Sequence, residues 1–67
     1  MLAECREDFK KLNLPVTLRR KYEWVNVYFN GHFVFSFDYE IFSALYRKNK
    51  QLEKIIIEVL HEQGYLS

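Results

Sequence analysis

The chain has 67 residues, 49% of them hydrophobic and 18% aromatic, and its ten Lys and Arg oppose nine Asp and Glu for a net charge of +1. This length excludes multi-domain architectures and the large enzyme folds, and the apolar content excludes a disordered chain. The balanced charge does not require a nucleic acid or an anionic membrane as partner. We therefore predict one small α+β domain over residues 1–67, with a thin core.

The cysteine count and the longest apolar run indicate the compartment. Cys5 is the only cysteine, so the chain cannot form an internal disulfide, and small extracellular domains usually carry several. The first residues lack a basic segment followed by a long apolar run, so no secretory signal is expected. The longest aliphatic run, residues 55–57, is far short of the ~20 residues of a membrane span. The sequence predicts a cytoplasmic protein that does not enter a membrane.

The first segment has a helical period. Leu2, Cys5, Phe9 and Leu12 follow one another at steps of three and four residues, which places them on one helix face. Pro15 cannot continue a helix and favours an extended conformation in the residue before it. We predict a short N-terminal helix over residues 2–12.

The second segment is a β-hairpin. Asn30-Gly31 separates two runs of β-branched and aromatic residues, and this dipeptide favours a type I′ turn with a two-residue loop. Such a loop predicts a uniform register in which Tyr28 faces Phe33 and Trp24 faces Phe37. One face of the two-stranded antiparallel hairpin would then carry Trp24, Asn26, Tyr28, Phe33, Phe35 and Phe37. The opposite face would carry Val25, Val27, Phe29, His32, Val34 and Ser36.

Two points of this hairpin remain open from the sequence. Residues 17–21 either lengthen the first strand or form a loop, and residues 18–22 favour an exposed, charged extension that would discourage edge-to-edge pairing. Both hairpin faces are largely apolar, whereas a hairpin covered on one side should alternate apolar and polar residues. Both faces therefore need a cover of some kind.

The third segment is a long C-terminal helix. Asp38 is a favourable N-cap, and Gly64 suits the residue after the last turn, with Tyr65 reaching back to Leu60. A helix over residues 39–63 would be about 37 Å long, against about 23 Å for each strand. The alternative is a helix over 39–47 followed by one over 50–63, with a break in the polar run 47–50.

Three arrangements would cover the hairpin. The two helices could take one face each, two chains could pair their sheets, or one face could serve as a docking surface. Small cores commonly need disulfides, a metal or self-association, and the first two are not expected here. A homodimer is therefore the favoured prediction.

The sequence does not indicate catalysis. His32 and His61 lie far apart without a ligand or nucleophile at a useful spacing, and Cys5 falls on an apolar helix face where burial is the simpler explanation. The two glycines do not form a phosphate-binding loop. We expect no enzymatic activity, no metal and no cofactor.

The leading hypothesis is a small protein-binding module, a regulator or inhibitor that docks an aromatic hairpin face onto a larger protein. The expected contact residues are Trp24, Asn26, Tyr28, Phe33 and Phe35. The alternative is single-stranded nucleic-acid or DNA binding, in which the same aromatic side chains stack on bases and basic clusters contact phosphates. Those clusters are Arg19, Arg20 and Lys21, and Arg47, Lys48 and Lys50.

Overall fold

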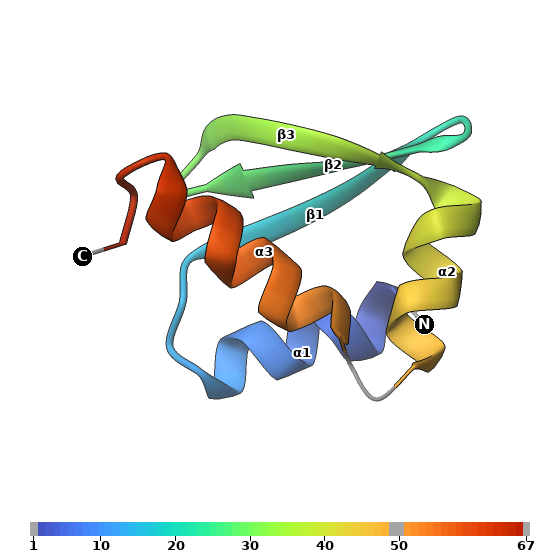
Figure 1. The fold of residues 1–67 in the computed structure, drawn as a ribbon, viewed down its shortest axis with the longest axis horizontal. Helices are drawn as coiled ribbons and strands as arrows, with labels where there is room; N and C mark the ends of the chain where they lie inside the picture. Colours follow the sequence, from blue (N-terminus) through green and yellow to red (C-terminus); the bar gives the residue numbers. More distant parts are fainter. Residues whose placement is uncertain (1, 49–50, 67) are drawn as a thin grey trace.

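The computed structural model describes residues 2–48 and 51–66 of the chain. In this part the elements follow in the order α1 (Leu2–Lys11), β1 (Val16–Lys21), β2 (Trp24–Phe29), β3 (His32–Asp38), α2 (Tyr39–Arg47) and α3 (Gln51–Glu62). The strands form one antiparallel sheet in the order β1-β2-β3. The described helices all lie on the same side of it, so the molecule has two layers (Figure 1).

Local sequence signals mark both ends of α1, the start of α2 and the end of α3 where they were expected. α1 occupies the predicted span to within one residue. The Asp38 carboxylate accepts a hydrogen bond of 2.8 Å from the Glu40 amide, as an N-cap should. After α3, Gly64 adopts a φ of +83°, and the Tyr65 amide donates to the Leu60 carbonyl at 2.8 Å. This arrangement is the predicted helix stop.

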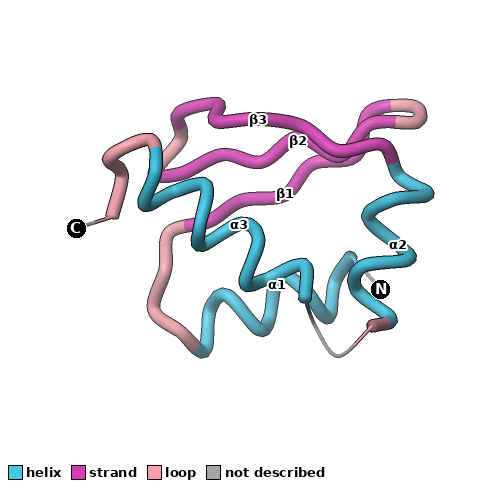
Figure 2. The backbone as a smooth tube through the Cα atoms, viewed as in Figure 1, coloured by secondary structure: helices cyan, strands magenta, loops and turns pink. Residues whose placement is uncertain are grey.

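The prediction of a single long C-terminal helix was wrong, and the alternative prediction of two helices is close to the structure. α2 ends at Arg47, where the Lys48 amide donates to the Leu45 carbonyl, and α3 begins at Gln51. α2 descends from the end of the sheet and α3 then runs back beneath it (Figure 2). Two short helices cover the sheet, whereas one straight helix would have overhung it.

The hairpin is in fact part of a three-stranded sheet. β1 pairs with the whole of β2, from Val16 opposite Phe29 to Lys21 opposite Trp24. The chain reverses at residues 22–23, where Tyr22 adopts a φ of +57°. A left-handed conformation usually falls to Gly, Asn or Asp, so the sequence carries no turn signal at this point.

A β-bulge changes the register of the β2–β3 hairpin. Near the Asn30-Gly31 turn the pairing is as predicted, with Tyr28 opposite Phe33. Beyond it Val27 faces Phe35, so Val34 is an additional residue on β3. An extra residue moves every following side chain to the other side of the sheet. Phe35 and Phe37 therefore lie on the helix side, which corrects their predicted place on the Trp24 face.

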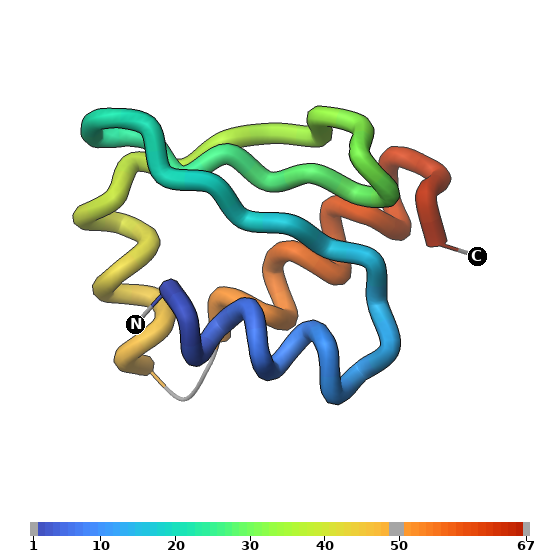
Figure 3. Tube along the Cα trace, turned by 180° about the vertical axis from the view of Figure 1, so that it is seen from behind, coloured from blue at the N-terminus to red at the C-terminus, as the bar shows by residue number. Residues whose placement is uncertain are grey.

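The core lies between the sheet and the helices. Figure 3, seen from behind, shows α1 running beneath β1. Every described element except β3 contributes at least one side chain with no solvent exposure. These fully buried residues are Cys5, Phe9, Leu18, Val25, Val27, Phe42, Leu52, Ile56 and Leu60. β3 contributes Val34, Phe35 and Phe37, which pack against this core and are partly buried.

A partly buried contact joins α1 and α2. The Tyr46 hydroxyl donates a hydrogen bond of 3.3 Å to Asp8 Oδ2. Burial, and next the negative charge of Asp8, raise the pKa of Tyr46 to about 12 from an ordinary value of 10.0. The folded state therefore holds the phenol proton more tightly than the unfolded state does.

This contact should make stability depend on alkaline pH. The contribution of Tyr46 to the free energy of unfolding is complete below pH 10 and is expected to fall as the pH rises to about 12. Urea unfolding at a series of pH values would measure the slope. Tyr46→Phe keeps the ring and removes the ionisable group, so it should flatten this part of the profile. Equal slopes for the two proteins would contradict the role of the contact.

Candidate functional site

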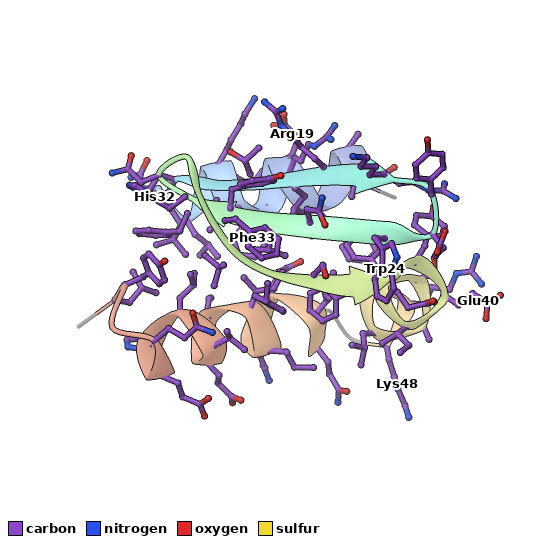
Figure 4. All side chains as sticks on the ribbon, turned by 90° about the horizontal axis from the view of Figure 1, so that it is seen from above. Arg19, Trp24, His32, Phe33, Glu40 and Lys48 are labelled. Atoms are coloured by element: carbon purple, nitrogen blue, oxygen red, sulfur yellow. The ribbon has the colours of Figure 1, made fainter. Side chains whose placement is uncertain are left out.

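The sheet has one face that no described helix covers, and we call it the open face. The strand register arranges its side chains in three rows that cross the sheet. The first row is Thr17, Tyr28 and Phe33. The second is Arg19, Asn26 and Ser36. The third is Lys21, Trp24 and Asp38. Figure 4 looks onto this face, with α1 behind the sheet and α3 alongside the outer edge of β3.

Aromatic side chains occupy both ends of the open face. Tyr28 and Phe33 are cross-strand neighbours in edge-to-face contact, with ring centroids 5.8 Å apart and an interplanar angle of 74°. Trp24 lies four residues from Tyr28 along β2, about 13 Å away. Phe33 is 56% exposed and Trp24 is 46% exposed, whereas aromatic side chains usually serve the core. These three rings form two separate apolar platforms.

Polar and cationic groups lie between the platforms. The Arg19 guanidinium carbon is 5.9 Å from the centre of the Tyr28 ring. Asn26, in the middle of the central strand, is partly buried. Asp38 is the one acid among the described residues of this face, and its carboxylate already caps α2. The open face therefore carries two cations, Arg19 and Lys21, and one engaged carboxylate.

A shallow depression opens beside the first row. Thr17, Arg19, Tyr28 and Gly31 line it, and its volume is about 200 Å³. Clefts that enclose small-molecule ligands usually hold roughly 300–1,000 Å³. The open face is therefore suited to an extended ligand lying across it rather than to a small molecule held inside it.

The structure brings four of the five predicted contact residues together. Trp24, Asn26, Tyr28 and Phe33 share the open face, as expected. Phe35 does not, because it pairs with Val27 on the helix side and stacks edge-on against Phe37 at 4.8 Å. The role of these side chains in binding stays a prediction.

The basic clusters are divided. Arg19 and Lys21 lie on the open face, whereas Arg20 points to the other side, where its guanidinium carbon lies 3.6 Å from the centre of the Tyr39 ring. Lys48 follows α2, and Figure 4 places it well away from Arg19. Arg47 belongs to the same end of α2. Lys50 lies outside the described residues.

Besides Asp38, which was expected only as an N-cap, sequence reasoning missed two residues of this face. Thr17 lies in a segment that was left open between strand and loop, and Ser36 was assigned to the opposite face by the uniform register. Both side chains are exposed, beside Tyr28 and Asn26 respectively. The sequence signals the β1 strand only weakly, and it does not signal the bulge at Val34.

The remaining side chains with possible chemical roles lie outside the three rows of the open face. Cys5 is fully buried in α1, as expected from its apolar helix face. His32 begins β3 and His61 is in the last turn of α3, and both are exposed. Over residues 2–48 and 51–66, no group of three or more His, Cys, Asp or Glu side chains is placed to hold a metal ion. None of the described helices is long and apolar enough to cross a membrane.

Comparison with known proteins adds no relative. No protein-family model, curated protein or solved structure matches the chain.

Proposed function

We propose that the protein is a non-enzymatic binding module whose open face binds single-stranded nucleic acid. The observation that carries this proposal is the shared position of three aromatic residues, two of them exposed and one partly buried, with two cations and one amide on a face that no described helix covers. Proteins that bind single strands combine these two ingredients, aromatic platforms for the bases and cations for the backbone. An open sheet presents both to a strand lying across it.

The platforms suit base stacking. Because Tyr28 and Phe33 meet edge to face, they do not stack on each other, and Phe33, at 56% exposure, leaves ring surface open to a base. Trp24 offers a second platform to a base further along the strand. Asn26 lies between the two and carries both a donor and an acceptor for a base edge.

The charge of the face predicts moderate affinity. Arg19 and Lys21 can each neutralise one phosphate, and for single strands each contact contributes about 0.7 to the slope of log affinity against log salt. Two contacts at about 0.7 each predict a slope of about −1.4. The net charge of only +1 also argues against a tight, purely electrostatic complex.

The leading hypothesis from the sequence was docking onto a larger protein. That hypothesis depended on a broader apolar surface. The bulge removes Phe35 and Phe37 from it and adds Ser36, so polar and cationic side chains separate the remaining aromatic residues. This mixture supports nucleic acid as the better-matched partner. Failure to bind any oligonucleotide would return the protein-docking hypothesis to first place.

Two neighbouring arginines provide the test. Fluorescence anisotropy with labelled single-stranded oligothymidylate and oligouridylate would measure binding across a salt series. Arg19→Gln is expected to weaken binding severalfold and to reduce the salt slope by about 0.7. Arg20→Gln makes the same charge change on the other side of the sheet and should leave both values unchanged. Undetectable binding, or equal effects of the two substitutions, would remove the proposal.

A further inference from the structure

The two outer strands of the sheet are protected to different degrees, and β1 is blocked. The Arg6 side chain reaches from α1 to the Leu18 carbonyl, with Nε at 3.0 Å and Nη2 at 2.6 Å. Three consecutive cations, residues 19–21, follow on the same strand. Occupied backbone groups and charged side chains are the usual devices that keep an edge strand from pairing with another chain.

β3 lacks the charges found on β1. Its interior, residues 33–37, is apolar apart from Ser36 and contains neither a charged residue nor a proline. It is also longer than β1, with seven residues against six. An uncharged, apolar edge strand of this length is a template for strand addition, and the bulge at Val34 is the one irregularity within it.

The surroundings of β3 are also incompletely covered. No residue of β3 is fully buried, although Val34, Phe35 and Phe37 pack against the core. Viewed from above, α3 runs alongside the outer edge of β3 rather than directly behind the strand (Figure 4). α3 also carries Ile55 and Val59, which are partly buried and lie outside the core cluster. A strand added next to β3, about 4.8 Å away, would lie over α3 and cover more apolar surface.

We propose that two copies of this chain pair through their β3 edges, antiparallel about a twofold axis, to form a six-stranded sheet. A twofold axis brings the same strand from each copy together in antiparallel order, which is the simplest closed contact. The strand has a histidine at its start and an aspartate at its end, so antiparallel pairing places His32 of each copy toward the Asp38 end of the other. A core of this size also gains from self-association.

Such a dimer would join the two open faces into one platform. Phe33 is the aromatic residue of the open face on β3, so the two Phe33 side chains would lie on the strands that meet at the twofold axis. Pairing through β3 does not require nucleic-acid binding, because it depends on the edge and not on the open face. Its test uses mass in solution without any oligonucleotide.

Light scattering behind a sizing column, across a concentration series, would measure the mass. The expected result is twice the 8.2 kDa of one chain, falling toward one chain on dilution. Ser36→Lys places a cation on β3 at an exposed position and should raise the dimer dissociation constant about tenfold or more. Thr17→Lys makes the same charge change at an exposed position of β1 and should leave the dimer intact.

Circular dichroism would establish that both lysine variants remain folded. A protein that stays monomeric at every concentration would overturn β3 pairing. A dimer weakened equally by the two lysine variants would also overturn it, because that result would place the contact on the open face. A dimer lost in Trp24→Ala but kept in Ser36→Lys would overturn β3 pairing for the same reason.

Discussion

Phe35→Ala is expected to lower the free energy of unfolding by about 3 kcal/mol, at the low end of the range for buried phenylalanine. Phe33→Ala, two residues away, should change it by less than about 1 kcal/mol. Phe35 faces Val27 and packs against the core, whereas Phe33 is 56% exposed on the open face. A loss of about 3 kcal/mol is a large part of the stability of so small a domain.

Urea unfolding followed by tryptophan fluorescence would measure both variants against the parent protein. The pair is its own control, because the residue type and the strand are the same and only the face differs. A uniform hairpin register would place both phenylalanines on one face and predict similar losses. Similar losses would therefore contradict the bulge at Val34.

Tyr28→Ala is expected to weaken oligonucleotide binding by about 5- to 150-fold, the equivalent of about 1–3 kcal/mol for one stacked base. Tyr28 pairs with Phe33 at the centre of the first row and also lies next to the Arg19 guanidinium. Its removal would take away the stacking surface and the ring that positions the cation. Anisotropy titrations at one fixed salt concentration would measure the loss.

Tyr22→Asn is the matched control for this substitution. Tyr22 is an exposed tyrosine, 80% accessible, that lies in the β1–β2 turn outside the three rows. Asparagine tolerates the φ of +57° that this position requires, so the turn should persist. The control should bind oligonucleotide as the parent protein does. Equal losses in both variants would mean that exposed aromatic surface acts without regard to position.

The two predictions together separate folding from binding. Phe33→Ala should reduce oligonucleotide binding while the domain stays folded, and Phe35→Ala should affect binding only through unfolding. A protein that loses binding in the first variant at unchanged stability would assign the open face its role. The bulge would then be a functional as well as a structural feature of the fold.

Several features were determined by the sequence alone, because their causes act over a few residues. The Asn30-Gly31 turn adopts positive φ at both positions, +52° and +84°, as its residue types favour. Asp38 caps α2 through a bond two residues away. Gly64 ends the last helix. The polar run at 47–50 suggested the helix break as an alternative. Each of these depends on local backbone preference.

The composition of the candidate site was decided by tertiary structure. The cross-strand register, and not the sequence pattern of β3, placed Phe35 on the core side and Ser36 on the open face. The turn at Tyr22 lacks a residue suited to it, so the third strand depends on its pairing with β2 rather than on a local signal. Both hairpin faces were apolar enough to accept a helix. The helices pack against Leu18, Val25 and Val27 and leave the opposite face uncovered. They lie on the same side of the sheet because this places their apolar faces in one shared core.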